Sequence, residues 1–438
     1  MASEPVVQAP AAAPNVTLSA AVSVWPLLAG MMVLMIGNGL LLALLGVRAT
    51  SEGFSNLVTG LIMSGYFAGF FAGTWLTPRI IETVGHVRVF AALASIASIA
   101  ALVHSLWVNP AGWIAMRGLT GFSFAGLYIV AESWLNASSH NRTRGRLLGI
   151  YALSQYTGLS LGQLMLGAAD PNGFALFIVC SIVVSAALVP ILLSPRPAPA
   201  FEAPSPLGLR ALMRVSPLGT AATFISGLTL GAFFSLGAVY ATEIGLSVAM
   251  VGVFLAAVTS GGSFLQWPIG RLSDTFDRRH VIVLISFAGA LASISAGLVA
   301  AHSTLALIVV GTVFGGLVLP VYSLSVAHTN DFLKPEQMVS GSSGLVVLFG
   351  AGSIFGPMLA AVAMDVSGPA GLFWYLAATT GLLGIFTLYR MAVREPKPLD
   401  EQSPYVPLLA HSSELAAPPE PEDEMPAAEP RPEAEKAR

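Results

Sequence analysis

The chain has 438 residues, of which 55% are hydrophobic and only 10% are charged, and its formal net charge at neutral pH is −3. Soluble globular proteins carry roughly 25% charged residues, so this composition excludes a soluble enzyme, a nucleic-acid-binding protein and a disordered protein. The single cysteine and seven scattered histidines exclude a disulfide framework and metal-ligand spacing, so neither a metal nor another cofactor is expected. The class that remains is a polytopic membrane protein.

Apolar runs recur along the chain, and each is long enough to cross a bilayer, which takes about 20 helical residues. The segment before the first run lacks the basic region of a signal peptide, so we count the first run as a span. The sequence therefore predicts an all-α integral membrane protein with twelve transmembrane helices, at residues 20–46, 55–77, 88–108, 112–135, 147–168, 173–193, 217–240, 248–270, 280–301, 304–328, 340–363 and 369–390.

Lysine and arginine lie unevenly on the two sides of the membrane that these spans define. With the N-terminus inside, 18 of the 20 cations lie in internal loops or in the C-terminal tail. Arg48, in an external loop, and Arg117, within the fourth span, are the exceptions. Because cytoplasmic loops carry an excess of lysine and arginine, both termini are predicted to be cytoplasmic.

The predicted spans divide into two sets of six. A six-helix bundle at 20–193 and a second at 217–390 are separated by a cytoplasmic linker rich in Pro and Arg at 194–216. The N-terminal tail, 1–19, and the acidic tail rich in Pro and Ala, 391–438, are predicted to be cytoplasmic and disordered, because such compositions bury too little apolar surface to fold.

The two sets of spans also resemble each other. A shift of 194 residues along the chain places Gly121 on Gly315 and Tyr128 on Tyr322, at equivalent points of the fourth and tenth spans. Chance matching is the alternative in a glycine-rich chain, but several identities at one shift favour duplication. Two pseudo-symmetric six-helix bundles around a central cavity are a transporter architecture.

The loop after the eighth span carries the most specific motif. It reads Gly270-Arg-Leu-Ser-Asp274-Thr-Phe-Asp-Arg278-Arg279 and resembles the signature loop of the major facilitator superfamily. Glycine lets two helices approach closely, and the aspartate suits the positive N-terminal end of a neighbouring helix, which the resemblance implies is the fifth span. An ordinary charged turn is the alternative. The predicted cytoplasmic gate comprises Gly270, Asp274, Arg278 and Arg279, with Arg144 and Arg146 at the start of the fifth span.

Two charged residues fall within the fourth span and are candidates for proton coupling. Arg117 opens a pattern that resembles the superfamily motif linked to coupling, and Glu132 is the only carboxylate inside a predicted span. Charges at bilayer depth are costly and so indicate function. Fifteen residues of helix place the two about 22 Å apart, too far for a direct ion pair. Snorkelling to the membrane surface is the alternative for each.

Uncharged polar residues in the spans must face the bundle interior or a watery cavity. They predict a substrate cavity that is polar but nearly uncharged, and the family resemblance implies that spans 1, 4, 7 and 10 line it. Interhelical hydrogen bonding is the alternative role for each of them. The candidates are Asn38, Tyr128, Gln155, Tyr156, Gln163, Gln266 and Tyr322.

Longer strings narrow the resemblance. Gly126 to Asn136, Gly145 to Tyr151, Gln266 to Asp274 and Pro320 to His328 are similar to the YcaD-like group of the superfamily, which are bacterial inner-membrane transporters. The resemblance covers residues 20–390 and implies a major facilitator fold with alternating access, but it names no substrate.

We therefore predict a non-enzymatic secondary transporter that moves a small organic solute across the bacterial inner membrane, with H⁺ as the candidate coupling ion. A monomer in the lipid bilayer is expected, with no nucleic-acid partner. The alternatives are an uncoupled facilitator, a multidrug exporter, and a non-transporting membrane sensor that signals through the C-terminal tail.

Overall fold

The computed structural model of the chain describes residues 24–137, 141–193, 208–334, 337–403 and 405–408, with residues 137, 141–144, 339 and 400 described by their backbone alone. All regular structure in these ranges is helical. The first part of the chain forms α2 (Trp25–Ser51), α3 (Asn56–Val84), α4 (His86–Leu106), α5 (Pro110–Ala137), α6 (Asn141–Leu164), the 3-10 turn η1 (Met165–Ala168), α7 (Ala175–Ala186) and α8 (Leu188–Leu192).

The second part of the chain repeats this pattern of long helices joined by short turns. It forms α9 (Leu209–Val215), α10 (Pro217–Glu243), α11 (Val248–Thr275), α12 (Arg278–Val299), α13 (Thr304–Val318), α14 (Pro320–Asn330), α15 (Met338–Ser367), α16 (Gly371–Val393) and the 3-10 turn η3 (Leu399–Glu401).

Among the described residues, eleven helical segments are long and apolar enough to cross a membrane, and they confirm eleven of the predicted spans. The predicted fifth span corresponds to α6, which is not among them. Polar side chains explain the difference, because Gln155, Tyr156 and Gln163 all lie on this helix and are buried in the protein. They therefore avoid lipid while lowering the average hydropathy of the helix.

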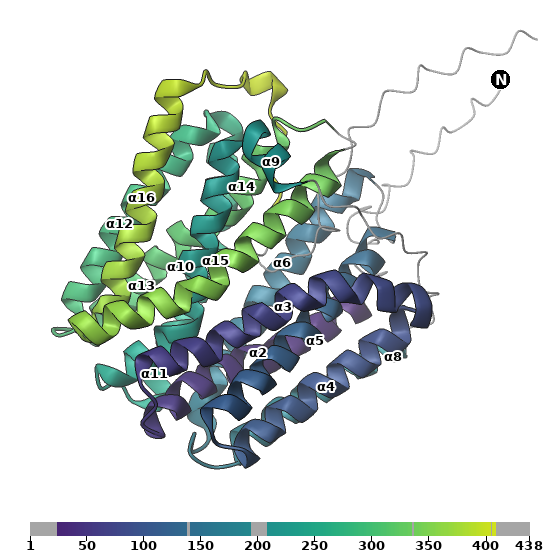
Figure 1. Cartoon of the computed structure of the whole chain (residues 1–438), viewed down its shortest axis with the longest axis vertical. Helices are drawn as coiled ribbons and strands as arrows, with labels where there is room; N and C mark the ends of the chain where they lie inside the picture. The colour runs from purple at the N-terminus through teal and green to yellow at the C-terminus, as the bar shows by residue number, and fades with distance from the viewer. Residues whose placement is uncertain (1–23, 138–140, 194–207, 335–336, 404, 409–438) are drawn as a thin grey trace, which may run out of the picture.

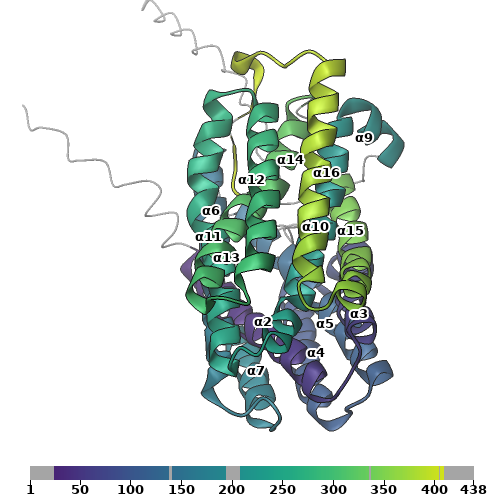
Figure 2. The same cartoon turned by 90° about the vertical axis from the view of Figure 1, so that its left-hand side faces the viewer.

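The helices gather into two groups that follow the order of the chain, as the purple-to-blue and teal-to-yellow halves of Figure 1 show. In the first group α3 packs on α5 and α2 on α6, while α4 packs on α5 and α7. In the second, α10 packs on α15, α12 on α16 and α11 on α13. The two groups meet where α3 contacts α15, α6 contacts α11 and α2 contacts α10, and the long helices run along a common direction in Figure 2.

The two ends of this assembly differ. We call the end that holds the α2–α3 turn the closed end, because the two groups touch there directly. The Ser64 hydroxyl on α3 donates to the Ile354 carbonyl oxygen on α15 at 2.7 Å. On α11, a Cβ atom added to Gly252 would overlap the Gln163 carbonyl oxygen of α6. Small residues thus let the backbones of the two groups meet.

We call the opposite end, where α16 stops, the tail end. Here the chain after α16 turns back over the helices (Figure 1). Residues 405–408 contact Gly145 and Gly149 of α6 on one side and Gly270 of α11 on the other. The side chains of Val406 and Leu408 join the hydrophobic core of the helices. Residues 394–403 and 405–408 thus differ from the disordered tail that composition predicts, because the apolar side chains of Tyr405, Val406 and Leu408 pack against the helices. The predicted tails 1–19 and 409–438 lie outside the described residues.

Candidate substrate cavity and gate

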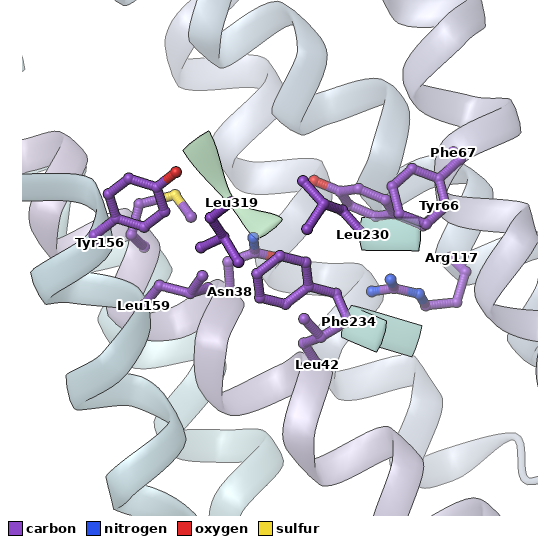
Figure 3. Close-up of a pocket in the computed structure, with 11 residues that line it drawn as sticks. Asn38, Leu42, Tyr66, Phe67, Arg117, Tyr156, Leu159, Leu230, Phe234 and Leu319 are labelled. Atoms are coloured by element: carbon purple, nitrogen blue, oxygen red, sulfur yellow. The ribbon is translucent and has the colours of Figure 1, made fainter. Parts of the chain in front are cut away.

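A cavity lies between the two groups of helices, and Figure 3 shows the side chains around it. Its volume is about 30 Å³, so an occupant larger than a water molecule requires the two groups to separate. Its walls come from α2, α3, α5, α6 and α10 and from the break between α13 and α14. Spans 1, 4, 7 and 10 all contribute, as predicted. The lining residues are Met35, Asn38, Leu42, Tyr66, Phe67, Arg117, Tyr156, Leu159, Leu230, Phe234 and Leu319.

Arg117 brings the one charge to this lining set. Its side chain is only 1% exposed, so it does not snorkel to the membrane surface. The guanidinium carbon stacks over the Tyr66 ring at 4.4 Å from the centroid, and the Nε and Nη1 atoms have no hydrogen-bond partner in the described part of the chain. A buried cation with free donors is costly unless a partner satisfies it.

Glu132 lies on the same continuous helix as Arg117, fifteen residues away, so the predicted separation of about 22 Å stands. The carboxylate is fully buried and lies close to Tyr151 of α6 and to Tyr128 of its own helix. This burial argues against snorkelling. Glu132 is not among the residues that line the cavity.

The other predicted polar residues divide between the cavity and helix contacts. Asn38 and Tyr156 line the cavity. Of the rest, the Tyr128 hydroxyl donates to the Met35 sulfur at 3.1 Å, which places Tyr128 one layer behind the wall.

The remaining four lie in the helix packing. Gln163 accepts a hydrogen bond from Thr259 of α11 at 3.0 Å, Gln266 donates to Ser323 at 3.1 Å, and Tyr322 contacts the Phe349 ring. Gln155 is buried on α6. For Gln163 and Gln266 the interhelical hydrogen bond, which was the alternative role, is therefore observed.

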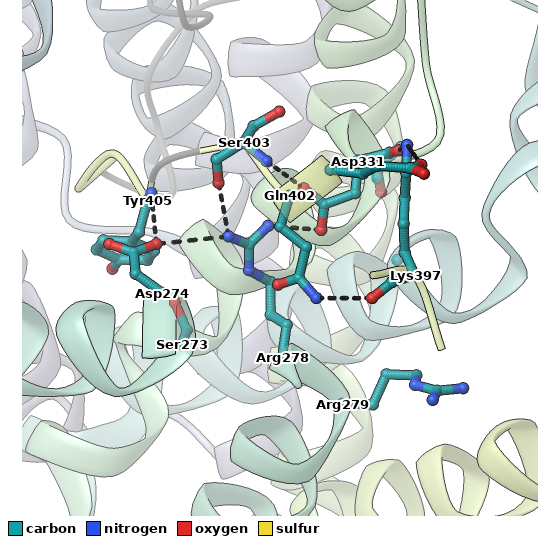
Figure 4. A network of polar contacts seen from close by, with 12 residues as sticks. Ser273, Asp274, Arg278, Arg279, Asp331, Lys397, Gln402, Ser403 and Tyr405 are labelled. Atoms are coloured by element: carbon teal, nitrogen blue, oxygen red, sulfur yellow. Dashed lines mark hydrogen bonds and ion pairs between the residues drawn. The ribbon is translucent and has the colours of Figure 1, made fainter. Parts of the chain in front are cut away.

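A network of charges lies at the tail end and contains three of the six residues of the predicted gate, Asp274, Arg278 and Arg279 (Figure 4). Arg278, which is 1% exposed, pairs with Asp331 at 2.6 Å and with the half-exposed Asp274 at 3.6 Å. Its Nη2 atom also donates to the Ser403 carbonyl oxygen at 2.8 Å. Burial raises the pKa of Asp331, an effect that the Arg278 charge opposes.

The second arginine of the motif makes separate contacts. Arg279 pairs with Asp277 at 2.7 Å and donates to the Arg394 carbonyl oxygen at 2.6 Å. Burial acts to raise the pKa of Asp277, but the hydrogen bonds and charge of Arg279 outweigh it, so this pKa lies below its usual range.

Two parts of the predicted gate differ from expectation. Gly270 was expected to admit a neighbouring helix, and it faces the Tyr405 ring instead. Asp274 was expected at the start of the fifth span, and its Oδ1 atom accepts the Tyr405 backbone N–H at 2.9 Å. The side chain of Arg144 lies outside the described residues and Arg146 is exposed, so an interaction of Asp274 with α6 stays a prediction.

Sequence reasoning missed Tyr66, Asp331 and Tyr405. Tyr66 is an aromatic residue among many on a membrane helix, and only its stacking on Arg117 distinguishes it. Of these three residues, Asp331 could have been identified from the local sequence, because it is an acidic residue that follows the tenth predicted span, next to His328-Thr-Asn330.

Apolar helices around a central cavity that is closed at one end are the arrangement of a membrane transporter. The model of the Major Facilitator Superfamily matches residues 27–262 and 219–419, and the chain therefore belongs to this superfamily. The MFS-type transporter YcaD of Escherichia coli strain SE11 is 28% identical over 378 residues, which is 85% of this chain and 97% of that protein. The protein of the same name from Shigella flexneri matches to the same extent.

Solved structures share the fold. A bacterial homologue of the human lysosomal transporter Spinster, in an inward-facing and occupied conformation, has a TM-score of 0.69 at 16% identity, covering 90% of this chain and 99% of that one. The nucleoside transporter NupG has a TM-score of 0.69 at 11% identity, covering 86% and 99%. These likenesses confirm the major facilitator fold that the signature loop implies.

Proposed function

We propose that this protein is a secondary transporter that moves a small organic solute across the bacterial inner membrane by alternating access. In this proposal α6, the fifth span in chain order, brings the number of spans to twelve. Residues 20–193 and 217–390 are the two six-helix bundles, and both termini are cytoplasmic. The tail end is then the cytoplasmic end. The protein acts as a monomer without a cofactor.

The observation that carries this proposal is the position of the cavity. It lies where the two bundles face each other, with direct contacts between them on the closed side of it and chain after α16 on the other. A site that one bundle can expose to either side by rocking against the other is the basis of alternating access. The inward-facing conformation of the Spinster homologue supports the view that the tail end is the open one.

The first experiment is a thermal-shift screen of metabolites and drugs on the purified full chain, followed by uptake of each hit into proteoliposomes. We expect at least one compound both to raise the unfolding temperature and to cross the membrane faster than in protein-free vesicles. Hits that bind but never cross would contradict the transporter proposal.

Proton coupling through Glu132 is tested separately. We expect Glu132→Gln to abolish the change of lumenal pH that accompanies transport of a hit compound, because the amide cannot take up and release a proton. A pH-sensitive dye inside the proteoliposomes measures this change. If the variant keeps both its transport rate and its pH signal, Glu132 is removed from the mechanism and Arg117 is left as the coupling candidate. If the wild-type protein transports without any pH signal, it is an uncoupled facilitator.

The sensor alternative is tested by the tail. A transporter without residues 409–438 should keep its flux, whereas a sensor that signals through this tail should lose its output. The multidrug alternative requires a site for organic cations, and no acidic residue stands among those that line the cavity in the described chain.

A further inference from the structure

The residues that line the cavity favour one chemical class of ligand. The cavity is lined by one cation, three uncharged polar side chains (Asn38, Tyr66 and Tyr156) and apolar residues. Among these lining residues of the described chain, Arg117 is the one with fully buried side-chain nitrogens that lack a hydrogen-bond partner. Figure 3 shows Arg117 and Tyr156 at opposite ends of the cavity with Phe234 and Leu230 between.

The geometry of Arg117 specifies the missing partner further. Tyr66 covers one face of the guanidinium, while the Nε and Nη1 atoms in its plane are free. A buried guanidinium with unpaired donors matches an anion, and a carboxylate oxygen can accept a charge-assisted hydrogen bond from it. Glu132 cannot supply it across about 22 Å of helix.

We propose that the substrate is a compact organic carboxylate whose anionic group pairs with Arg117 and whose apolar body lies against Leu230, Phe234 and Phe67. This inference rests on the proposed function for transport, but it makes its own statement about binding. The uncharged Tyr156, at the end of the cavity opposite Arg117, leaves room at the other end of the molecule for a hydroxyl or amide group.

Three matched probes test it: benzoate, benzamide and benzylamine, with their larger ring-substituted analogues. On the full chain we expect the carboxylates to raise the unfolding temperature and the amides and amines not to. Arg117→Gln should weaken carboxylate binding at least about tenfold, the loss of one charge-assisted hydrogen bond, and Arg117→Lys should keep part of it. Arg48→Gln, which removes an arginine away from the cavity, should bind like the wild type.

Equal stabilisation by amines or amides, no stabilisation by any carboxylate, or full carboxylate binding in Arg117→Gln would overturn the anionic class. Uptake into proteoliposomes separates this result from the proposed function. Transport of an amine would support the transporter proposal and refute the carboxylate substrate. Carboxylates that bind without crossing would support the carboxylate ligand and contradict the transporter proposal.

A second inference rests on a different observation, the segment between α6 and α11. At the closed end these two helices touch, since Thr259 of α11 donates to Gln163 of α6. At the tail end, Gly145 and Gly149 of α6 face the side chains of Val406 and Pro407, and a Cβ atom on either glycine would lie 3.9 or 3.8 Å from them. The same helix pair is therefore in contact at one end and separated by residues 405–408 at the other.

Hydrogen bonds from motif residues fix this segment in place. Its Tyr405 N–H binds Asp274, and the Ser403 N–H before it binds Asp331 at 2.9 Å. At its far end Leu408 exchanges two hydrogen bonds with the Ser323 hydroxyl of α14, at 3.0 and 2.8 Å. Gln266 adds a third, at 3.3 Å to the Leu408 carbonyl oxygen.

We infer that Ser403 and residues 405–408 form an autoinhibitory wedge. Closing the tail end requires α6 and α11 to approach, and the segment occupies the space into which they would move. Its release is then a condition for each transport cycle, and Asp274, Asp331 and Ser323 hold it in the resting state.

Distances between spin labels test the wedge without a known substrate. In a Cys180→Ala background, Arg88→Cys on α4 and His280→Cys on α12 report the tail end, and Asp170→Cys with His302→Cys report the closed end; all four positions are exposed. Deleting residues 403–438 should shift the tail-end distances shorter and the closed-end distances longer. Deleting only 409–438 keeps the wedge and should leave both distributions as in the full chain.

The same distances in both deletions and the full chain would overturn the inference. Because a truncated chain can also unfold, Ser323→Ala provides a second variant, which removes two hydrogen bonds to Leu408 and retains the whole tail. It should give an intermediate shift of the label distances at both ends. The wedge is refuted if the distances are unshifted both in Ser323→Ala and in a 403–438 deletion that still elutes as a folded monomer.

Discussion

Replacing Arg278 with methionine is expected to be among the most destabilising single changes in this protein. The guanidinium is 1% exposed and pairs with Asp331 at 2.6 Å, and the aspartate side chain is 2% exposed. Removing one partner of such a pair leaves a buried carboxylate uncompensated, which costs about 3–5 kcal/mol. The unfolding free energy of the purified chain, followed by denaturant titration in detergent, should fall by that order.

A double variant distinguishes loss of charge balance from loss of packing. Arg278→Met with Asp331→Leu removes both charges and should recover a large part of the lost stability, because no buried charge is then left alone. Arg271→Met is the matched control, since Arg271 is exposed and stacks on Trp267 at 3.9 Å; it should change stability by less than about 1 kcal/mol. A double variant no more stable than Arg278→Met would show that the ion pair is not the source of the effect.

Much of the fold could be predicted because a bilayer imposes a simple local requirement. An apolar run of sufficient length becomes a helix wherever it occurs, so the predicted spans agree with the observed helices to within a few residues at most ends, as for 217–240 against α10 (Pro217–Glu243). The helix α6 lies at the limit of this rule. Its polar residues face protein, and apolar length alone identifies it poorly.

The site was less predictable, since it depends on pairs of residues that are far apart in the chain. A charge inside a span identified Arg117, but no local pattern indicates that Tyr66 covers it. Ser403 and Asp331 are 72 residues apart, and the composition of the tail favours disorder. Three packed apolar side chains and a few backbone hydrogen bonds determine the path of this segment, and these follow no sequence period.

Gly252 offers the sharpest test of the moving parts. Gly252→Ala adds a methyl group where α11 meets the Gln163 carbonyl oxygen of α6, so it strains the contact between the two bundles at the closed end. Overpacking of this kind costs about 1–3 kcal/mol, and here the cost falls only on conformations in which the closed end is closed. We expect the population in which the two bundles have separated at the closed end to rise about tenfold or more. Longer distances between spin labels at positions 170 and 302 would report this population.

The matched control is Gly121→Ala, which places its methyl group against the Tyr66 carbonyl oxygen between α5 and α3. Both helices belong to the first bundle, so the strain is present in every conformation. This variant should lower the unfolding temperature and leave the label distances unchanged. If Gly252→Ala instead destabilised the protein like Gly121→Ala without moving the labels, the contact between α6 and α11 would be a fixed part of the fold, and rocking of two rigid bundles about the cavity would be excluded.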